Sequence, residues 1–313
     1  MIKFLTVLFL THFTVLGSAA TFRSQDPLEM AAEYYFSRHD YKEALKLWNK
    51  VLDKNPKNVD ALMRVSELSL MFGSRELSRK VITDFLDKWS QKITPDQVKL
   101  IHSKLKDLQS KFLSDEGQSL YLQATSKMEH KDWERSLELL KQALAQEQGH
   151  LEILRQKAIC EKQLGNFAEF YATLKQAFEA DPYDPQLMEW MSEAHLYFKQ
   201  FENALTALKG PTKELTTVRQ ELAFAFASIK TGKVDQAIPI LKNLLSRKKG
   251  QLPDVAYYAL GLALYQKPEA HTEAARYLKL FLSLRQQHPP TGWDPYAELV
   301  TTTEAKKMIA QLS

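Results

Sequence analysis

The sequence repeats a short phrase at a period close to 34 residues, and this period constrains the fold more than any other feature. The phrase places a small residue three positions after an aromatic one at the start of an amphipathic helix, as with Tyr41 and Ala44 in "YKEALKLWNKVL". The marker position is then occupied in turn by Ser78, Ser136, Phe170, Ala204, Ala237 and Ala274. A fixed period of this length predicts an array of stacked repeats rather than one central core.

Each of these helices follows a second apolar-periodic segment, which carries a small residue near its middle. The small residues are Ala32, Ser66, Ala124, Ala158, Ser192, Ala225 and Gly261. A small side chain at this place lets two helices approach closely. Gly165 and Gly232 lie between such segments, where a glycine can end a helix in the left-handed conformation. The pattern therefore predicts a unit of helix, turn and helix.

This unit resembles the tetratricopeptide repeat in its period, in its aromatic-x-x-alanine phrase and in the prolines, such as Pro56 and Pro182, that end second helices. The resemblance implies an all-α, right-handed α-solenoid of helix-turn-helix repeats. It covers seven units, at 25–58, 59–92, 117–150, 151–184, 185–217, 218–253 and 254–290. We therefore expect residues 21–92 to hold repeats one and two, and residues 117–290 to hold repeats three to seven.

Two segments depart from the period. Residues 93–116 separate the second and third repeats, and their apolar residues recur every three or four positions, which predicts an inserted amphipathic helix. This helix is either a filler that covers exposed core or a protruding partner-binding element, and the sequence leaves both open. After the last repeat, residues 291–313 are predicted to form a capping helix, starting near Asp294, that shields the end of the array.

The first twenty residues are typical of a secretory signal peptide. Lys3 precedes an apolar run that ends at Leu16, and small residues follow up to Ala20, after which we predict cleavage. The run is shorter than the ~20 residues of a membrane span, although an uncleaved anchor is the alternative. We therefore expect a periplasmic or secreted protein without a stable transmembrane anchor after cleavage.

Composition and motifs argue against a catalytic or nucleic-acid-binding protein. The net charge of +4 is spread over 313 residues rather than gathered in one basic patch. The sequence has neither a phosphate-binding loop nor a metal-binding histidine pair at helical spacing, and its single cysteine, Cys160, is expected to be buried. We therefore expect no catalytic residues, no metal and no cofactor, and predict that the chain is not an enzyme.

The resemblance implies that the first helix of each repeat lines a concave groove, so the candidate partner-binding residues are taken from first helices. The expected groove is acidic toward its N-terminal end and apolar and aromatic toward its C-terminal end. The candidates are Glu29, Glu33, Glu67, Tyr121, Arg155, Lys162, Glu193, Tyr197, Phe226, Ile229, Tyr258, Leu262 and Tyr265. Glu29 and Glu33 stand where chaperone-binding relatives carry lysines and asparagines, so a carboxylate clamp is not expected.

These features predict a non-catalytic scaffold that binds a protein or peptide, of unknown identity, and organises a cell-envelope or periplasmic complex. The alternatives are a peptidoglycan-associated binding factor and an RNA-binding helical-repeat protein; the acidic and apolar groove disfavours the latter. The apolar end of the groove suits an amphipathic helix or an extended peptide. Whether that end is open, or is filled by residues 294–312 folding back, stays undecided at this level.

Overall fold

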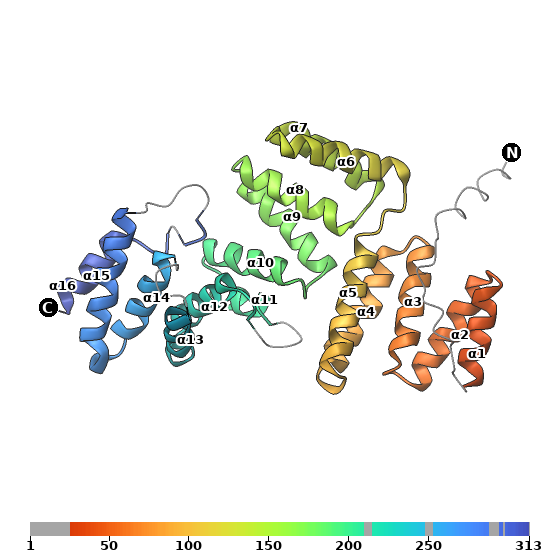
Figure 1. The fold of residues 1–313 in the computed structure, drawn as a ribbon, viewed down its shortest axis with the longest axis horizontal. Helices are drawn as coiled ribbons and strands as arrows, with labels where there is room; N and C mark the ends of the chain where they lie inside the picture. Colours follow the sequence, from red (N-terminus) through yellow and green to blue (C-terminus); the bar gives the residue numbers. More distant parts are fainter. Residues whose placement is uncertain (1–25, 210–214, 248–252, 288–293, 297, 313) are drawn as a thin grey trace. The chain divides into compact units, whose positions relative to one another are not determined.

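The computed structural model describes residues 26–209, 215–247, 253–287, 294–296 and 298–312, and confirms the predicted all-α repeat fold. Sixteen α-helices and no strand occur in these ranges, about 80% of which is helical (Figure 1). The helices are α1(Pro27–Ser37), α2(Tyr41–Lys54), α3(Val59–Met71), α4(Arg75–Trp89), α5(Pro95–Gln109), α6(Asp115–Glu129), α7(Trp133–Gln146), α8(Leu151–Gln163), α9(Phe167–Ala180), α10(Pro185–Tyr197), α11(Phe201–Ala207), α12(Val218–Lys230), α13(Val234–Arg247), α14(Asp254–Tyr265), α15(His271–Gln287) and α16(Thr302–Gln311).

The chain divides into two compact units, residues 1–61 and 62–313, which are described separately. In the first unit, α1 packs on α2, and the small residues Ala32 and Ala44 are fully buried. Lys54 Nζ lies 2.8 Å from the Asp26 carboxylate, so it ties the end of α2 to the start of α1. The predicted signal peptide, residues 1–20, lies outside the described residues.

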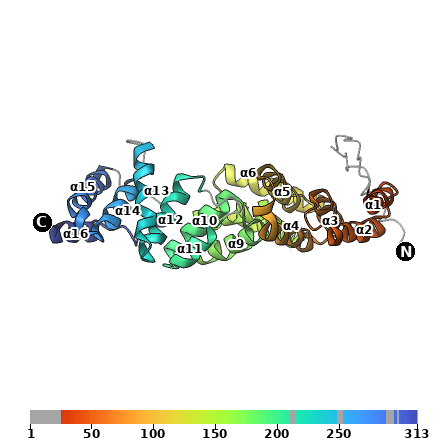
Figure 2. The same cartoon turned by 90° about the horizontal axis from the view of Figure 1, so that it is seen from below.

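In the second unit, helices that are adjacent in sequence pack in pairs: α6 on α7, α8 on α9, α10 on α11, α12 on α13 and α14 on α15 (Figures 1 and 2). The predicted small residues lie at these contacts, and Ala124, Ala158 and Ala225 have no exposed surface. Helices α14 and α15 of the last pair approach closely at Gly261. A Cβ atom added to Gly261 would lie 2.7 Å from Cγ of Leu278, so no side chain fits there.

Two smaller expectations are also settled. Cys160 is fully buried, and burial raises the pKa of its thiol. Helix α11 ends at Ala207 after only seven residues, and the Lys209-Gly210-Pro211 sequence that follows predicts this early end, because glycine and proline interrupt helices. Among the described residues, no helix has both the length and the apolar character needed to span a membrane.

The inserted segment forms helix α5, which is packed into the array. A capping box between Thr94 and Gln97 starts the helix. Its apolar stripe is buried and α5 contacts α4, which makes it a filler between repeats rather than a protruding element. The stripe consists of Val98, Ile101, Leu105 and Leu108.

A buried ion pair fastens the inserted segment to the repeats on both sides. Arg75, at the start of α4, donates to the Glu147 carboxylate at 2.8 Å and to the carbonyl oxygens of Leu108, Gln109 and Lys111 at 2.9–3.1 Å. The second Glu147 oxygen accepts the backbone N–H groups of residues 113 and 114 at 2.7 and 2.6 Å. The pair therefore satisfies the carbonyls at the end of α5 and fixes the entry into α6.

His150 completes this joint from the start of α8. Its ring lies 4.0 Å from the ring of Phe112, centroid to centroid. Burial and the nearby charge of Arg75 lower the pKa of His150 to about 3, so the ring is neutral at physiological pH. A neutral ring can pack on Phe112 without bringing a second positive charge next to Arg75.

The inserted helix also contacts a turn that is two repeats further along the chain. His102 lies 2.9 Å from Asp181, and Lys106 lies 3.6 Å from Asp184. The Tyr183 hydroxyl donates to Asp87 on α4. In most repeat arrays each repeat contacts only its neighbours, so these bonds join repeats that an ideal array would leave apart.

The expectation of a helix starting near Asp294 is wrong, because α16 begins only at Thr302. The Asp294 carboxylate accepts the Tyr296 N–H at 2.9 Å, and the Tyr296 carbonyl accepts from Leu299 and Val300. These local bonds form a turn where the periodicity alone predicts helix. We call residues 294–300 the C-terminal turn; residues 291–293, 297 and 313 of the predicted cap lie outside the described part.

Replacing Arg75 with methionine is expected to lower the free energy of unfolding of the second unit by about 3–5 kcal/mol, because Glu147 would stay buried without its counter-charge. The control is Lys242→Met, which removes an exposed pair with Glu273 and should cost less than about 1 kcal/mol. Urea titrations followed by circular dichroism measure both. Similar small losses in the two variants would contradict the role of the Arg75–Glu147 joint.

Candidate partner-binding face

The first helices of repeats five to seven lie side by side in the second unit. Helix α10 packs against α12, and α12 packs against α14, while α8 precedes them in the same order along the chain. We call the exposed and half-buried side of α8, α10, α12 and α14 the first-helix face. It is the structural counterpart of the C-terminal part of the predicted groove.

A cluster of opposite charges lies on this face between α10 and α12. Arg219 donates from Nε to Glu193 Oε1 at 2.8 Å, and its Nη2 bonds the second oxygen of the same carboxylate. The same Nε lies 3.3 Å from Glu189, which also accepts the Thr217 hydroxyl at 2.6 Å. Glu193 is fully buried, whereas about half of the Arg219 side chain is exposed.

The pKa values show how these charges depend on one another. Burial raises the pKa of Glu193 to about 7, even though Arg219 opposes this rise. Burial alone would lower the pKa of Arg219, but the hydrogen bond and charge of Glu193 raise it above its ordinary value. Burial, followed by the charge of Arg219, lowers the pKa of Lys162 on α8. The protonation of each group in the cluster therefore depends on its burial and on the charges of the other groups.

The apolar end of the expected groove is closed in the structure. Phe226, Ile229 and Tyr258 are almost completely buried, so they offer no open surface to a partner in this conformation. Tyr296, Leu299 and Val300 belong to the same apolar cluster. The Tyr296 ring centroid lies 4.9 Å from that of Phe226, while Tyr258 packs on Phe281 of α15 with a centroid distance of 5.1 Å. The alternative in which the C-terminal residues fold back is therefore the one the structure adopts.

The last two candidates lie at the edge of this covered region. Leu262 is half-buried in the same apolar cluster. Tyr265, also half-buried, donates its hydroxyl to Gln311 of α16 at 2.6 Å. Tyr265 therefore contacts the C-terminal helix rather than an open groove.

The candidates on the earlier first helices are partly engaged within the protein. Arg155 is nearly buried, and it donates to Asp184 at 2.9 Å and to Gln186. Tyr121 packs on Phe112 of the inserted segment with a centroid distance of 5.3 Å. Tyr197 is half-buried at the end of α10, beside other aromatic rings. Tyr197 therefore retains more accessible surface than the buried aromatic candidates.

The other three acidic candidates do not belong to the Glu193 cluster. In the first unit, Glu29 accepts from the Asn58 amide at 2.5 Å, and Glu33 is half-buried on the same helix. In the second unit, Glu67 lies 3.6 Å from Arg64 and 4.0 Å from Lys104. Whether these carboxylates bind a partner stays a prediction.

One residue of the observed face, Tyr296, was not among the expected site residues, whereas Glu189 and Arg219 lie at first-helix positions of the kind predicted to line the groove. Glu189 and Arg219 lie on first helices with opposite charge, which is a signal that could have paired them. Tyr296 gave no such signal, because its role depends on a turn where the periodicity indicates a helix.

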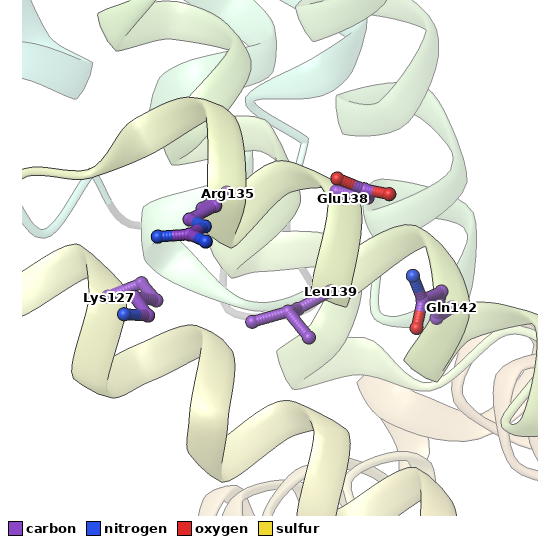
Figure 3. Close-up of a pocket in the computed structure, with 5 residues that line it drawn as sticks. All are labelled: Lys127, Arg135, Glu138, Leu139 and Gln142. Carbon is purple, nitrogen blue, oxygen red and sulfur yellow. The ribbon is translucent and has the colours of Figure 1, made fainter.

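A separate shallow pocket of about 330 Å³ lies between α6 and α7. Figure 3 shows Leu139 at its centre, with Lys127, Arg135, Glu138 and Gln142 around it. Its lining mixes both signs of charge and comes from a single repeat. Within the described ranges, no group of three or more histidine, cysteine or acidic side chains is placed to hold a metal ion.

Comparison with protein families identifies the repeats. Tetratricopeptide-repeat models match residues 29–91 and 127–187, so the chain contains tetratricopeptide repeats at these places. A search of curated protein sequences found no match. Such repeats generally belong to non-catalytic scaffolds.

Solved structures of low sequence identity resemble parts of the chain. A MamA fragment from Desulfovibrio magneticus RS-1 is 16% identical, with a TM-score of 0.48, over 57% of this chain and 100% of the fragment. YrrB, described as a TPR protein with an unusual peptide-binding site, is 16% identical, with a TM-score of 0.48, over 61% of this chain and 93% of its own. A repeat protein from Parabacteroides merdae is 14% identical, with a TM-score of 0.41, over 81% and 90%.

The buried cluster predicts a specific pH dependence. Because the pKa of Glu193 is about 7 in the folded protein and 4.5 ordinarily, the folded state binds a proton more tightly between these values. Its contribution to the free energy of unfolding is therefore present below pH 4.5 and falls as the pH rises to 7, by on the order of 3 kcal/mol. Glu193→Gln cannot titrate and should lack this fall.

The measurement compares urea unfolding of wild type and Glu193→Gln from pH 4.5 to 8. The stability of the variant relative to wild type should rise with pH across this range. His150, whose pKa is lowered to about 3, gives a slope of the opposite sign in both proteins and cancels in the difference. A difference that does not change with pH would show that Glu193 is charged throughout.

Proposed function

We propose that the protein is a non-catalytic scaffold that binds a protein or peptide on its first-helix face. One observation carries the proposal: this face already holds an aromatic side chain from a segment outside the repeats. Tyr296 buries its ring against Phe226 and places it near the charges of Glu193 and Arg219. A surface that accepts an aromatic side chain from its own chain has the shape and polarity to accept one from a partner.

The composition of the face supports this function in energetic terms. Burying an aromatic side chain of 150–250 Å² is worth several kcal/mol at about 25 cal/mol per Å², and aromatic residues dominate many binding hot spots. The Glu189–Glu193–Arg219 cluster adds ionisable groups beside the apolar floor. Such charges set orientation and specificity more than affinity.

We further propose that the protein is exported and acts in a periplasmic or secreted assembly. The support is the sequence of residues 1–20, with its basic start, apolar run and small residues before position 21. A scaffold with repeat-borne binding faces suits the assembly of an envelope complex, because several helices can hold one extended partner.

Site-specific photo-crosslinking in intact cells tests partner binding. A photoreactive phenylalanine replaces Tyr197 on α10, and the matched control replaces Tyr277, a half-buried tyrosine on the second helix α15. Position 197 should give a discrete crosslinked protein, and position 277 should not. Equal crosslinking at both positions, or none at 197 beside a folded protein, would contradict binding on the first-helix face. Alanine at Phe226 or Tyr258 is unsuitable, since losing a buried aromatic costs about 3–5 kcal/mol.

Sequencing the N-terminus of the protein purified from its native cells tests export. Cleavage after Ala20 predicts a mature chain that begins at Thr21 and is recovered from the extracytoplasmic fraction. A chain that retains residues 1–20 would show that the segment is not removed. The control variant is Ala20→Arg, which replaces the small residue before the predicted cleavage point with a large charged one and should block cleavage.

A further inference from the structure

The C-terminal turn is held on the first-helix face mainly by apolar contacts. Tyr296, Leu299 and Val300 are buried in the cluster formed by α12 and α14. The turn makes two ion pairs: Glu298 with Lys199 at 2.8 Å, where both side chains are more than half exposed, and Asp294 with Arg285 of α15 at 3.8 Å, where both are mostly buried. The exposed pair contributes little, so the buried apolar residues and the Asp294–Arg285 pair hold the turn in place.

The fit of Tyr296 is imperfect. Its hydroxyl is buried and has no hydrogen-bond partner among the described residues. Buried tyrosine hydroxyls usually find a partner, and an unsatisfied one opposes burial. Glu189, Glu193 and Arg219 are the charged groups of α10 and α12 near this ring, and Asp294 lies on the turn itself. The Tyr296 hydroxyl is thus buried near charged groups to which it makes no hydrogen bond.

We propose that the C-terminal turn is a displaceable intramolecular ligand of the first-helix face. The site beneath it takes a peptide segment with one aromatic side chain flanked by apolar residues, and the turn competes with that segment. This inference rests on the proposed binding function and adds its regulation. A ligand held by its own chain competes at an effective concentration in the millimolar range, so closure weakens the apparent affinity for the partner.

The test uses the full chain and a fluorescent synthetic peptide with the sequence of residues 294–302, DPYAELVTT. Fluorescence anisotropy measures its binding to wild type, Tyr296→Ala and Tyr296→Phe. Tyr296→Ala weakens closure and should bind the peptide at least tenfold more tightly than wild type. Tyr296→Phe removes the unsatisfied hydroxyl, strengthens closure and should bind several-fold more weakly.

A crosslinked variant holds the turn closed. Lys199→Cys and Glu298→Cys are joined by a short bis-maleimide, which spares the buried Cys160. The crosslinked protein should not bind the peptide, whereas the same protein before crosslinking should. The matched control joins Glu202→Cys and Lys233→Cys, an exposed pair 3.2 Å apart away from the turn, and should leave binding unchanged.

Three outcomes would overturn the inference. The first is that wild type and both Tyr296 variants bind the peptide with equal affinity, and the second is that the crosslinked protein still binds it. The third is that Tyr296→Ala loses hydrogen-exchange protection across α12 and α14. The last would make the turn a structural cap. Partner crosslinking through position 197 separates the two proposals. If the partner is captured equally by Tyr296→Ala and by the crosslinked, closed protein, displacement is refuted but binding is not. If no variant captures a partner, the binding function itself is refuted.

Discussion

The close contact between the two helices of each repeat is the constraint on which the rest of the structure depends. Ser136 illustrates it, because its hydroxyl reaches across to the carbonyl of Ala124 at 3.0 Å, a distance that only small side chains permit. Gly261 against Leu278 is the limiting case. The contacts between the two helices of a repeat use one side of the first helix. The other side does not contact the second helix, so it can carry charges and aromatic rings.

The period made the helices and their pairing predictable, since it records contacts between residues about a dozen positions apart. The joint around the inserted helix was not predictable in the same way. Arg75 and Glu147 are 72 positions apart and belong to different repeats, so no local pattern connects them. The bonds from α5 to Asp181 and Asp184 are also long-range. Such contacts become visible only when the whole array is folded.

In the candidate site too, the local features could be predicted from the sequence and the long-range contacts could not. Their position on first helices predicted Phe226 and Tyr258 as groove residues, but both are buried, Phe226 against Tyr296 and Tyr258 against Phe281 of α15. The periodic apolar residues after Asp294 indicate a helix, whereas the Asp294 carboxylate captures the Tyr296 N–H and makes a turn.

The most direct test of the central claim is hydrogen exchange of the full-length protein with and without the partner recovered by crosslinking. If the partner replaces the C-terminal turn, exchange should increase at residues 294–300 and decrease along α10, α12 and α14. The protection of α1 and α2, in the other unit, serves as an internal reference. Slower exchange in the C-terminal turn upon binding, or protection confined to the second helices, would contradict the account.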